Sequence, residues 1–142
     1  MLVSMEEIKG RAKVLGRLGY LPQDESEEQY LFLNIAFVKF AEDAKPYSLT
    51  RSLKTFEMDE PLVFLDECNY IAYPPKITTG TKNIELDNDL VDLFVWCYLS
   101  QLNPDKKEIV ENYKKGLAEY RGRRHNERFG KPQEQTRLSE LI

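Results

Sequence analysis

The sequence LVFLDECNYIAYPPKITTGTKNIELDNDLVDLFVWCYLSQL, residues 62–102, decides the fold. It begins with two short segments, 62–65 and 70–73, that are rich in β-branched and aromatic residues and are typical of strands. The polar residues 66–69 between them predict a hairpin turn. Pro74-Pro75 ends the second strand, because proline has no N–H to donate to a neighbouring strand. A lone hairpin is marginal in water, so we expect it to rest on helices or on another subunit.

An apolar helix follows the hairpin, after the polar turn 77–83. Three acids lie at its start, where they favour the positive end of the helix dipole: Asp87, Asp89 and Asp92. The helix continues to Leu102 and is the most apolar helix in the chain. A fourth helix is expected directly after it, with Asn103 as the cap and Pro104 in the first helical position. The short connection predicts that these two helices form an antiparallel pair.

Two helices are expected before the hairpin. The first begins at Ser4, which has capping-box spacing from Glu7. We expect Gly19 to end it, because glycine accepts the left-handed conformation found after helices. The second begins near Ser26 and ends at Lys45-Pro46. Its wide apolar face predicts a central position in the fold. That face comprises Tyr30, Leu31, Ile35, Phe37, Val38 and Ala41.

These elements predict a mainly α fold with a four-helix-bundle-like core. A small antiparallel β-hairpin arm is inserted between helices 2 and 3, and an extended tail follows at the C-terminus. We expect the helical domain in residues 1–124, with the arm at about 47–75, and the tail in residues 125–142. A chain of 142 residues, of which 42% are apolar, can form one such core. No apolar run approaches the ~18 residues of a membrane helix, and Glu6 and Glu7 argue against a secretion signal, so we expect an intracellular protein.

Charge is distributed unevenly along the chain. Residues 1–120 contain 14 Lys and Arg against 21 Asp and Glu, whereas residues 121–142 contain 6 against 3. An acidic body with a basic tail indicates a tail that docks onto an acidic surface or onto a phosphate backbone. The acidic body makes broad binding to nucleic acid unexpected.

The tail and the hairpin contain the candidate interface residues. Five cations can contact an acidic groove or DNA, or can remain solvated: Arg121, Arg123, Arg124, Arg128 and Lys131. Three apolar residues can insert into a neighbouring subunit, or can stay unbound as termini often do: Leu138, Leu141 and Ile142. Three aromatic residues of the hairpin can form an interface patch, or can pack onto the chain's own helices: Phe64, Tyr70 and Tyr73.

No residue pattern requires catalysis, a metal or a cofactor. The three aspartates can bind a divalent cation, but capping and solvation also explain them, and no EF-hand loop surrounds them. Cys97 can act as a nucleophile with His125, but its aromatic neighbours favour a buried thiol. Cys68 and Cys97 belong to no CxxC pair, and with one His they fall short of a structural zinc set. We therefore expect buried free thiols, and no enzyme activity, metal or cofactor.

Three features together carry a resemblance to a known family. Two N-terminal helices are separated by Leu18-Gly19-Tyr20, a strand runs into prolines at 69–75, and an Ile-x-Leu-acid sequence at 84–87 leads into an apolar helix and a longer polar-faced helix. In this order of elements, residues 5–124 resemble the head-to-tail connector proteins of tailed bacteriophages, also called adaptor or head-completion proteins. The loop 78–83 is shorter than in that family, and the family's Leu-Pro is replaced here by Leu-Asp.

The resemblance implies a structural virion protein and not an enzyme. Such a protein is one subunit of a ring, usually of twelve copies, that joins the portal of a capsid to the tail and lines the DNA channel. Its partners are other copies, the portal protein and further tail or connector proteins, while DNA passes without sequence-specific binding. No membrane is involved, and the protein is found in the virion and, during assembly, in the host cytoplasm. The basic segment leaves open a second hypothesis, a small DNA-associated or regulatory binding protein.

Overall fold

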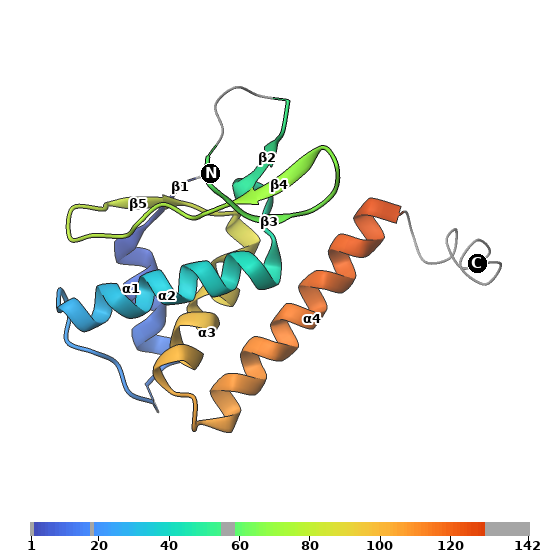
Figure 1. Cartoon of the computed structure of the whole chain (residues 1–142). Helices are drawn as coiled ribbons and strands as arrows, with labels where there is room; N and C mark the ends of the chain where they lie inside the picture. The colour runs from blue at the N-terminus through green and yellow to red at the C-terminus, as the bar shows by residue number, and fades with distance from the viewer. Residues whose placement is uncertain (1, 18, 55–58, 130–142) are drawn as a thin grey trace.

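The structure is a computed structural model that describes residues 2–17, 19–54 and 59–129, the last five as backbone (Figure 1). In these ranges the chain forms four α-helices and two small antiparallel sheets. The helices are α1 (Met5–Leu15), α2 (Glu27–Ala44), α3 (Val91–Leu102) and α4 (Lys107–Phe129). Two 3-10 turns, η1 (Tyr47–Leu49) and η2 (Asn88–Leu90), precede strand β2 (Thr50–Ser52) and helix α3. The fold is mainly α, as the sequence predicted.

The first two helices begin where their caps predict. The Ser4 hydroxyl accepts a hydrogen bond of 3.1 Å from the Glu7 N–H, and Ser26 does the same for Gln29 at 3.2 Å. The expected end of α1 at Gly19 is wrong, because α1 ends at Leu15 with Gly16 as its cap. A Cβ on Gly16 would lie 2.5 Å from a methyl carbon of Leu99. Glycine at position 16 thus allows α1 to approach α3 closely.

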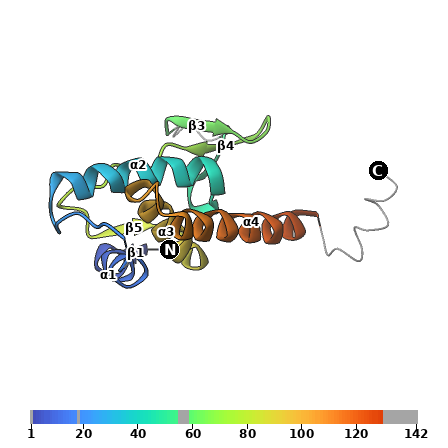
Figure 2. The same cartoon turned by 90° about the horizontal axis from the view of Figure 1, so that it is seen from below.

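The central helix is α3 and not α2, which corrects the prediction. Helix α3 packs against α1, α2 and α4 (Figure 2). The ring of Phe94 on α3 makes edge-on contacts with Phe37 at 5.3 Å and with Phe40 at 5.6 Å between centroids. The expected α2 face was wrong in part, since Leu31 and Ile35 are exposed while Phe40 is buried. Helix α2 therefore has more apolar surface than its own chain covers.

The β structure differs from a lone hairpin arm. Strands β3 (Pro61–Phe64) and β4 (Asn69–Ala72) are antiparallel, and the carboxylate of Asp66 closes their turn by accepting from the Cys68 N–H at 2.7 Å. Strand β2 (Thr50–Ser52) pairs with the other edge of β4, so the sheet order is β2-β4-β3. The third strand provides the support that a two-stranded hairpin lacks.

A second sheet was not predicted. Strand β1 (Leu2–Ser4) pairs antiparallel with β5 (Asn83–Glu85), so that Val3 lies opposite Ile84 and both are buried. This pairing fixes the beginning of the chain beside the segment that leads into α3. The Ile-x-Leu-acid sequence is thus the end of a strand followed by a 3-10 turn.

Helix α4 begins later and ends later than expected. It starts at Lys107 and not at Pro104, because the side chain of Asn103, the expected cap, bonds to the backbone of Tyr20. It continues to Phe129 and so crosses the boundary at residue 124, where we expected the extended tail to begin. The remaining tail residues, 130–142, lie outside the described part of the chain. Within that part, no helix combines the length and apolarity needed to cross a bilayer.

Candidate functional site

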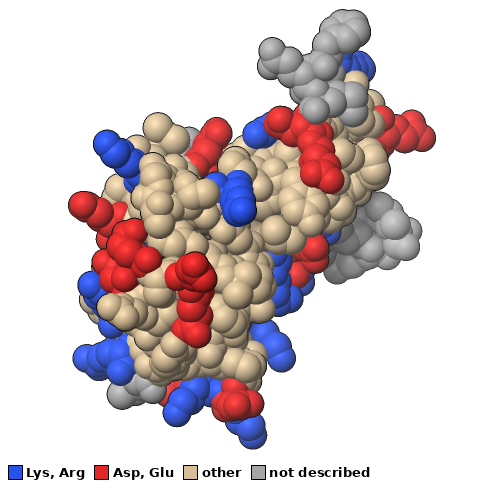
Figure 3. All heavy atoms as spheres, turned by 60° about the vertical axis from the view of Figure 1, so that its left-hand side comes forward, with Lys and Arg blue, Asp and Glu red and all other residues tan. Residues whose placement is uncertain are grey.

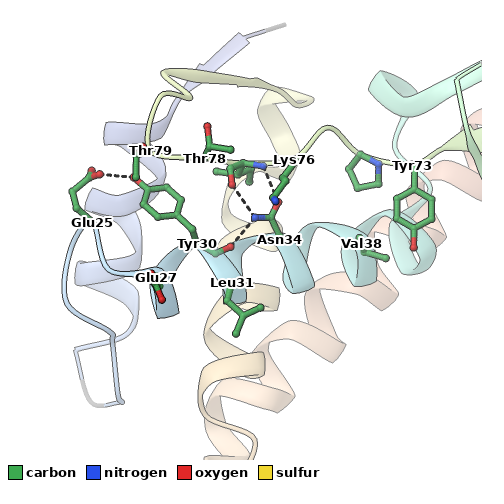
Figure 4. A pocket seen from close by; sticks show the side chains of 12 residues that line it. Glu25, Glu27, Tyr30, Leu31, Asn34, Val38, Tyr73, Lys76, Thr78 and Thr79 are labelled. Atoms are coloured by element: carbon green, nitrogen blue, oxygen red, sulfur yellow. Dashed lines mark hydrogen bonds between the residues drawn. The ribbon is translucent and has the colours of Figure 1, made fainter.

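Two buried or half-buried asparagines hold irregular segments onto helices. Asn34 on α2 donates 2.8 Å hydrogen bonds to the carbonyls of Ile77 and Tyr30, and its side-chain oxygen accepts from the Ile77 N–H at 2.7 Å (Figure 4). Asn103 bonds to the backbone of Tyr20 with the same pattern. Its side-chain oxygen accepts from the Tyr20 N–H at 2.6 Å, and its side-chain nitrogen donates to the Tyr20 carbonyl at 3.0 Å. Each side-chain amide bonds to both the N–H and the carbonyl of one distant residue, as a neighbouring strand would. The bonds of Asn34 therefore fix the segment around Ile77 on α2.

A groove of about 630 Å³ lies between α2 and the fixed segment, and we call it the α2 groove. Figure 4 shows side chains from both walls, with Leu31 and Val38 on the helix and Tyr73 and Lys76 on the segment. Its apolar lining residues are Leu31, Val38, Tyr73, Pro74 and Ile77. Because Asn34 fixes one wall to the other, the groove is formed before any partner binds.

Two apolar side chains of the groove, Leu31 and Tyr73, are exposed, and so is Ile35 beside it. Leu31 is 56% exposed, Ile35 is 42% exposed and Tyr73 is 44% exposed. At 3.6 residues per turn, Leu31, Ile35 and Val38 form one stripe on the side of α2 opposite Phe40, which faces the core. We call these three residues the α2 stripe. Exposed apolar side chains on one side of a helix form a candidate interaction surface.

Acidic residues lie at the N-terminal end of α2. Glu25 and Glu27 line the groove, and Asp24 precedes them. Lys9 on α1 pairs with Glu25 at 2.6 Å and with Asp24 at 3.2 Å. The hydrogen bond from Lys9 holds the pKa of both carboxyl groups below the usual range. Figure 3, in which the left-hand side of Figure 1 comes forward, shows acidic side chains beside a broad uncharged area.

Three of the arginines predicted as interface residues bond to other residues of the same chain. Arg121 donates to the Asp43 carbonyl at 2.9 and 3.2 Å, and Arg124 donates to the Ala44 carbonyl at 3.1 Å. Arg123 pairs with Asp89 at 3.5 Å. The contacts of Arg121 and Arg124 hold α4 against the C-terminal end of α2, whose last carbonyls lack helical partners, whereas Arg123 connects α4 to η2. Arg128 lies in the last turns of α4, while Lys131, Leu138, Leu141 and Ile142 lie outside the described residues.

The three hairpin aromatics do not share one surface. Phe64 is 63% exposed and Tyr73 is partly exposed, whereas Tyr70 is fully buried. The rings of Phe64 and Tyr70 lie 6.3 Å apart between centroids. Phe64 and Tyr73 are thus available to a partner, and Tyr70 packs within the chain.

Asp87, Asp89 and Asp92 each have a different partner in the structure. Asp92 pairs with Arg11 on α1 at 2.6 Å, Asp89 pairs with Arg123, and Asp87 accepts from the Tyr47 N–H at 3.2 Å. Burial raises the pKa of Asp87. Among the described residues, no three His, Cys, Asp or Glu side chains are grouped as metal ligands would be. These contacts connect α3 to α1 through Asp92, and connect η2 and the residue before it to α4 and to the start of η1 through Asp89 and Asp87.

The two cysteines have opposite environments. Cys97 is buried on α3, its thiol lies 3.5 Å from the Ala36 carbonyl, and burial raises its pKa to about 12. Cys68 is exposed in the turn between β3 and β4, which corrects the expectation that both thiols are buried. A thiol with so high a pKa is a weak source of thiolate at neutral pH.

The α2 groove was missed by reasoning from the sequence. The available signal was Asn34, a polar residue between Leu33 and Ile35 in an otherwise apolar stretch of α2. An asparagine in a helix interior that is flanked by apolar residues needs partners for its amide, and here a distant backbone segment supplies them. The sequence gives no means of locating that segment.

The comparisons with known proteins return no relative. No family model matches the chain, and no curated protein or solved structure matches it.

Proposed function

We propose that this chain is a subunit of an oligomeric ring that joins the portal of a phage capsid to the tail and lines its DNA channel. It is a structural role, carried out in the virion and, during assembly, in the host cytoplasm. The observation that carries the proposal is the apolar surface left uncovered on one side of the fold, at the α2 stripe and on the adjoining Tyr73. Such a surface is suited to contact with other protein copies.

The order of the elements supports the same proposal. After the short strand β1, the described chain has two helices, then the three strands of the β2-β4-β3 sheet, then β5 running into η2 and the apolar α3, and finally the long polar α4. This is the order expected of a connector subunit, with its Ile-x-Leu-acid sequence at β5. We propose that α1–α4 form the helical core of such a subunit and that the sheet with Phe64 at its edge forms the arm that contacts a neighbour.

The alternative is a small DNA-associated or regulatory protein that uses the basic C-terminal segment. The partners of Arg121, Arg123 and Arg124 weigh against it, because all three guanidinium groups contact the fold itself. DNA binding would fall steeply with salt, since cations that neutralise phosphates release counterions. Measurable binding to a duplex at low salt that disappears in the Arg128→Gln/Lys131→Gln variant would favour the alternative.

The test of the proposal is the mass of the purified full-length protein, measured alone and with portal protein. We expect a closed oligomer, alone or on the portal, with about twelve copies in the ring. The Phe64→Asp variant is expected to weaken this assembly, because it places a charge on the exposed arm. A protein that stays monomeric and never binds portal would refute the proposal.

A further inference from the structure

We infer that the α2 groove is the docking site for residues 130–142 of another copy of this chain. The inference rests on the proposed function and names the contact that closes the ring. The occupant is the C-terminal segment GKPQEQTRLSELI, and its receptor is the groove between α2 and the segment fixed by Asn34.

The apolar residues of the α2 groove and those of the C-terminal segment are suited to each other. The groove presents Leu31, Val38 and Tyr73 on walls that Asn34 holds together. In the segment, Leu138, Leu141 and Ile142 follow the i, i+3, i+4 spacing that places three side chains on one side of a helical turn. An amphipathic turn laid into an apolar groove is a common mode of recognition. Because the groove is already formed, little ordering is required of the receptor.

Charged side chains also line the groove. Glu25 and Glu27 lie at its end near the start of α2, beside Asp24, and Lys76 lies on the wall formed by the fixed segment. Lys9 pairs with Asp24 and Glu25. The segment carries two cations, Lys131 and Arg137, and two acids, Glu134 and Glu140, so its side chains have no net charge and only the two cations can face the acidic end of the groove. Opposite charges at the rim of an apolar contact set its orientation and speed association more than they add affinity.

The position of the end of α4 and the length of the segment after it also support docking between copies. Arg121 and Arg124 fix α4 at the C-terminal end of α2, and α4 then continues to Phe129. Figures 1 and 2 both show this last part of α4 projecting beyond the rest of the fold. The 13 residues that follow span at most about 43 Å when extended. We therefore expect the segment to be long enough to reach the α2 groove of an adjacent copy.

Cysteine cross-linking in the full-length chain tests the inference directly. In a Cys68→Ser background, Leu31→Cys is combined with Ile142→Cys and oxidised under mild conditions. We expect covalent dimers and a ladder of higher species. The matched control combines Val14→Cys with Ile142→Cys, because Val14 is 69% exposed on α1, outside the groove, and we expect at least about fivefold less product. Equal yields from the two pairs would overturn the groove assignment, and a product cross-linked only within one chain would overturn docking between copies.

A mixing experiment supplies a second, independent readout. Leu31→Asp disables the groove, and Leu141→Asp disables the segment, each in the full-length chain. Each variant alone is expected to lose self-association at least about tenfold, the usual effect of a charge at the centre of an interface. Their mixture is expected to form heterodimers, since each pair retains one intact groove and one intact segment. Absence of heterodimers, with both variants folded by circular dichroism, would overturn the inference.

The two experiments also separate this inference from the proposed ring. If Leu31→Asp assembles on the portal as the wild type does, the ring stands and the docking site is wrong. If the cross-link forms between copies but no portal complex appears, docking stands and the connector function is wrong.

Discussion

The guanidinium of Arg124 lies 4.1 Å from the centroid of the Tyr47 ring, and the same group donates to the Ala44 carbonyl at 3.1 Å. One side chain on α4 thus stacks on the first residue of η1 and caps the end of α2. Lys45 ends α2 in a left-handed conformation at φ 49°, which turns the chain towards Tyr47. The contact therefore joins three elements at the point where α4 leaves the body.

Removal of this contact is expected to loosen α4. Arg124→Ala should lower the free energy of unfolding by about 1–2 kcal/mol, from the lost stacking and the lost hydrogen bond. Arg124→Lys should recover less than half of this, because an ammonium cannot stack and donate as a planar guanidinium does. Urea denaturation measures both. The comparison is Arg123→Ala, whose guanidinium pairs with Asp89 on the surface and lies farther from an aromatic ring, 5.8 Å from the Tyr120 centroid, so we expect a smaller loss than for Arg124→Ala. Equal losses for the two alanine variants would contradict this account.

The wall of the α2 groove depends on Asn34. Asn34→Ala is expected to destabilise the protein by about 2 kcal/mol, because it leaves the Ile77 N–H and carbonyl without their partner. Asn34→Asp keeps the acceptor and loses the donor, and we expect a similar loss. Amide hydrogen exchange at Ile77 should accelerate in both variants. If Ile77 exchange is unchanged in folded Asn34→Ala, the groove wall is held by something else.

Two glycines on either side of the α1 boundary should respond in opposite ways. A Cβ on Gly19 would meet the Asn103 side-chain oxygen and an Ile109 methyl at 2.9 Å each. Gly19→Ala is expected to destabilise by about 1–3 kcal/mol, because it separates Tyr20 from Asn103. Gly10 lies inside α1 with open space around it, so Gly10→Ala should stabilise by about 0.5–1 kcal/mol. Thermal or urea unfolding compares the pair, and effects of the same sign would be inconsistent with these contacts.

Alkaline pH should destabilise the fold through Cys97. Burial raises the pKa of its thiol from 9.0 to about 12, so the folded state holds the proton more tightly than the unfolded state. The stabilisation is complete below about pH 9 and is lost as the pH rises towards 12, at up to about 1.4 kcal/mol per pH unit. The Cys97→Ala variant should show a flatter decline of unfolding free energy between pH 9 and 10.5. Identical slopes would show that the thiol does not titrate differently on folding.

Local signals in the sequence located several elements correctly. Ser4 and Ser26 mark the starts of α1 and α2, because a cap acts within one turn. The turn between 62–65 and 70–73 was found for the same reason, since Asp66 bonds to residues only two and three positions away. Features set by contacts within a few residues can be read from those residues alone.

Most of the errors involve contacts between distant residues. Gly16 ends α1 because of Leu99, Asn103 bonds to Tyr20 and not to α4, and β1 pairs with β5 across 80 residues of sequence. Arg121 and Arg124 were predicted either to contact an acidic groove or DNA or to remain solvated, but they donate to carbonyls at the end of α2. The α2 groove belongs to the same class, because it exists only where Asn34 meets Ile77. Spacing along one segment cannot predict these pairings.

The central claim is that the uncovered side of α2 belongs to an assembly of copies on a portal. The most direct measurement is the native mass of the full-length protein with portal protein, together with hydrogen exchange at Leu31 and Ile35. The account predicts a ring-sized complex in which amides along this part of α2 become protected relative to the dissociated chain. A persistent monomer, or a ring in which this side of α2 exchanges as freely as in the monomer, would contradict it.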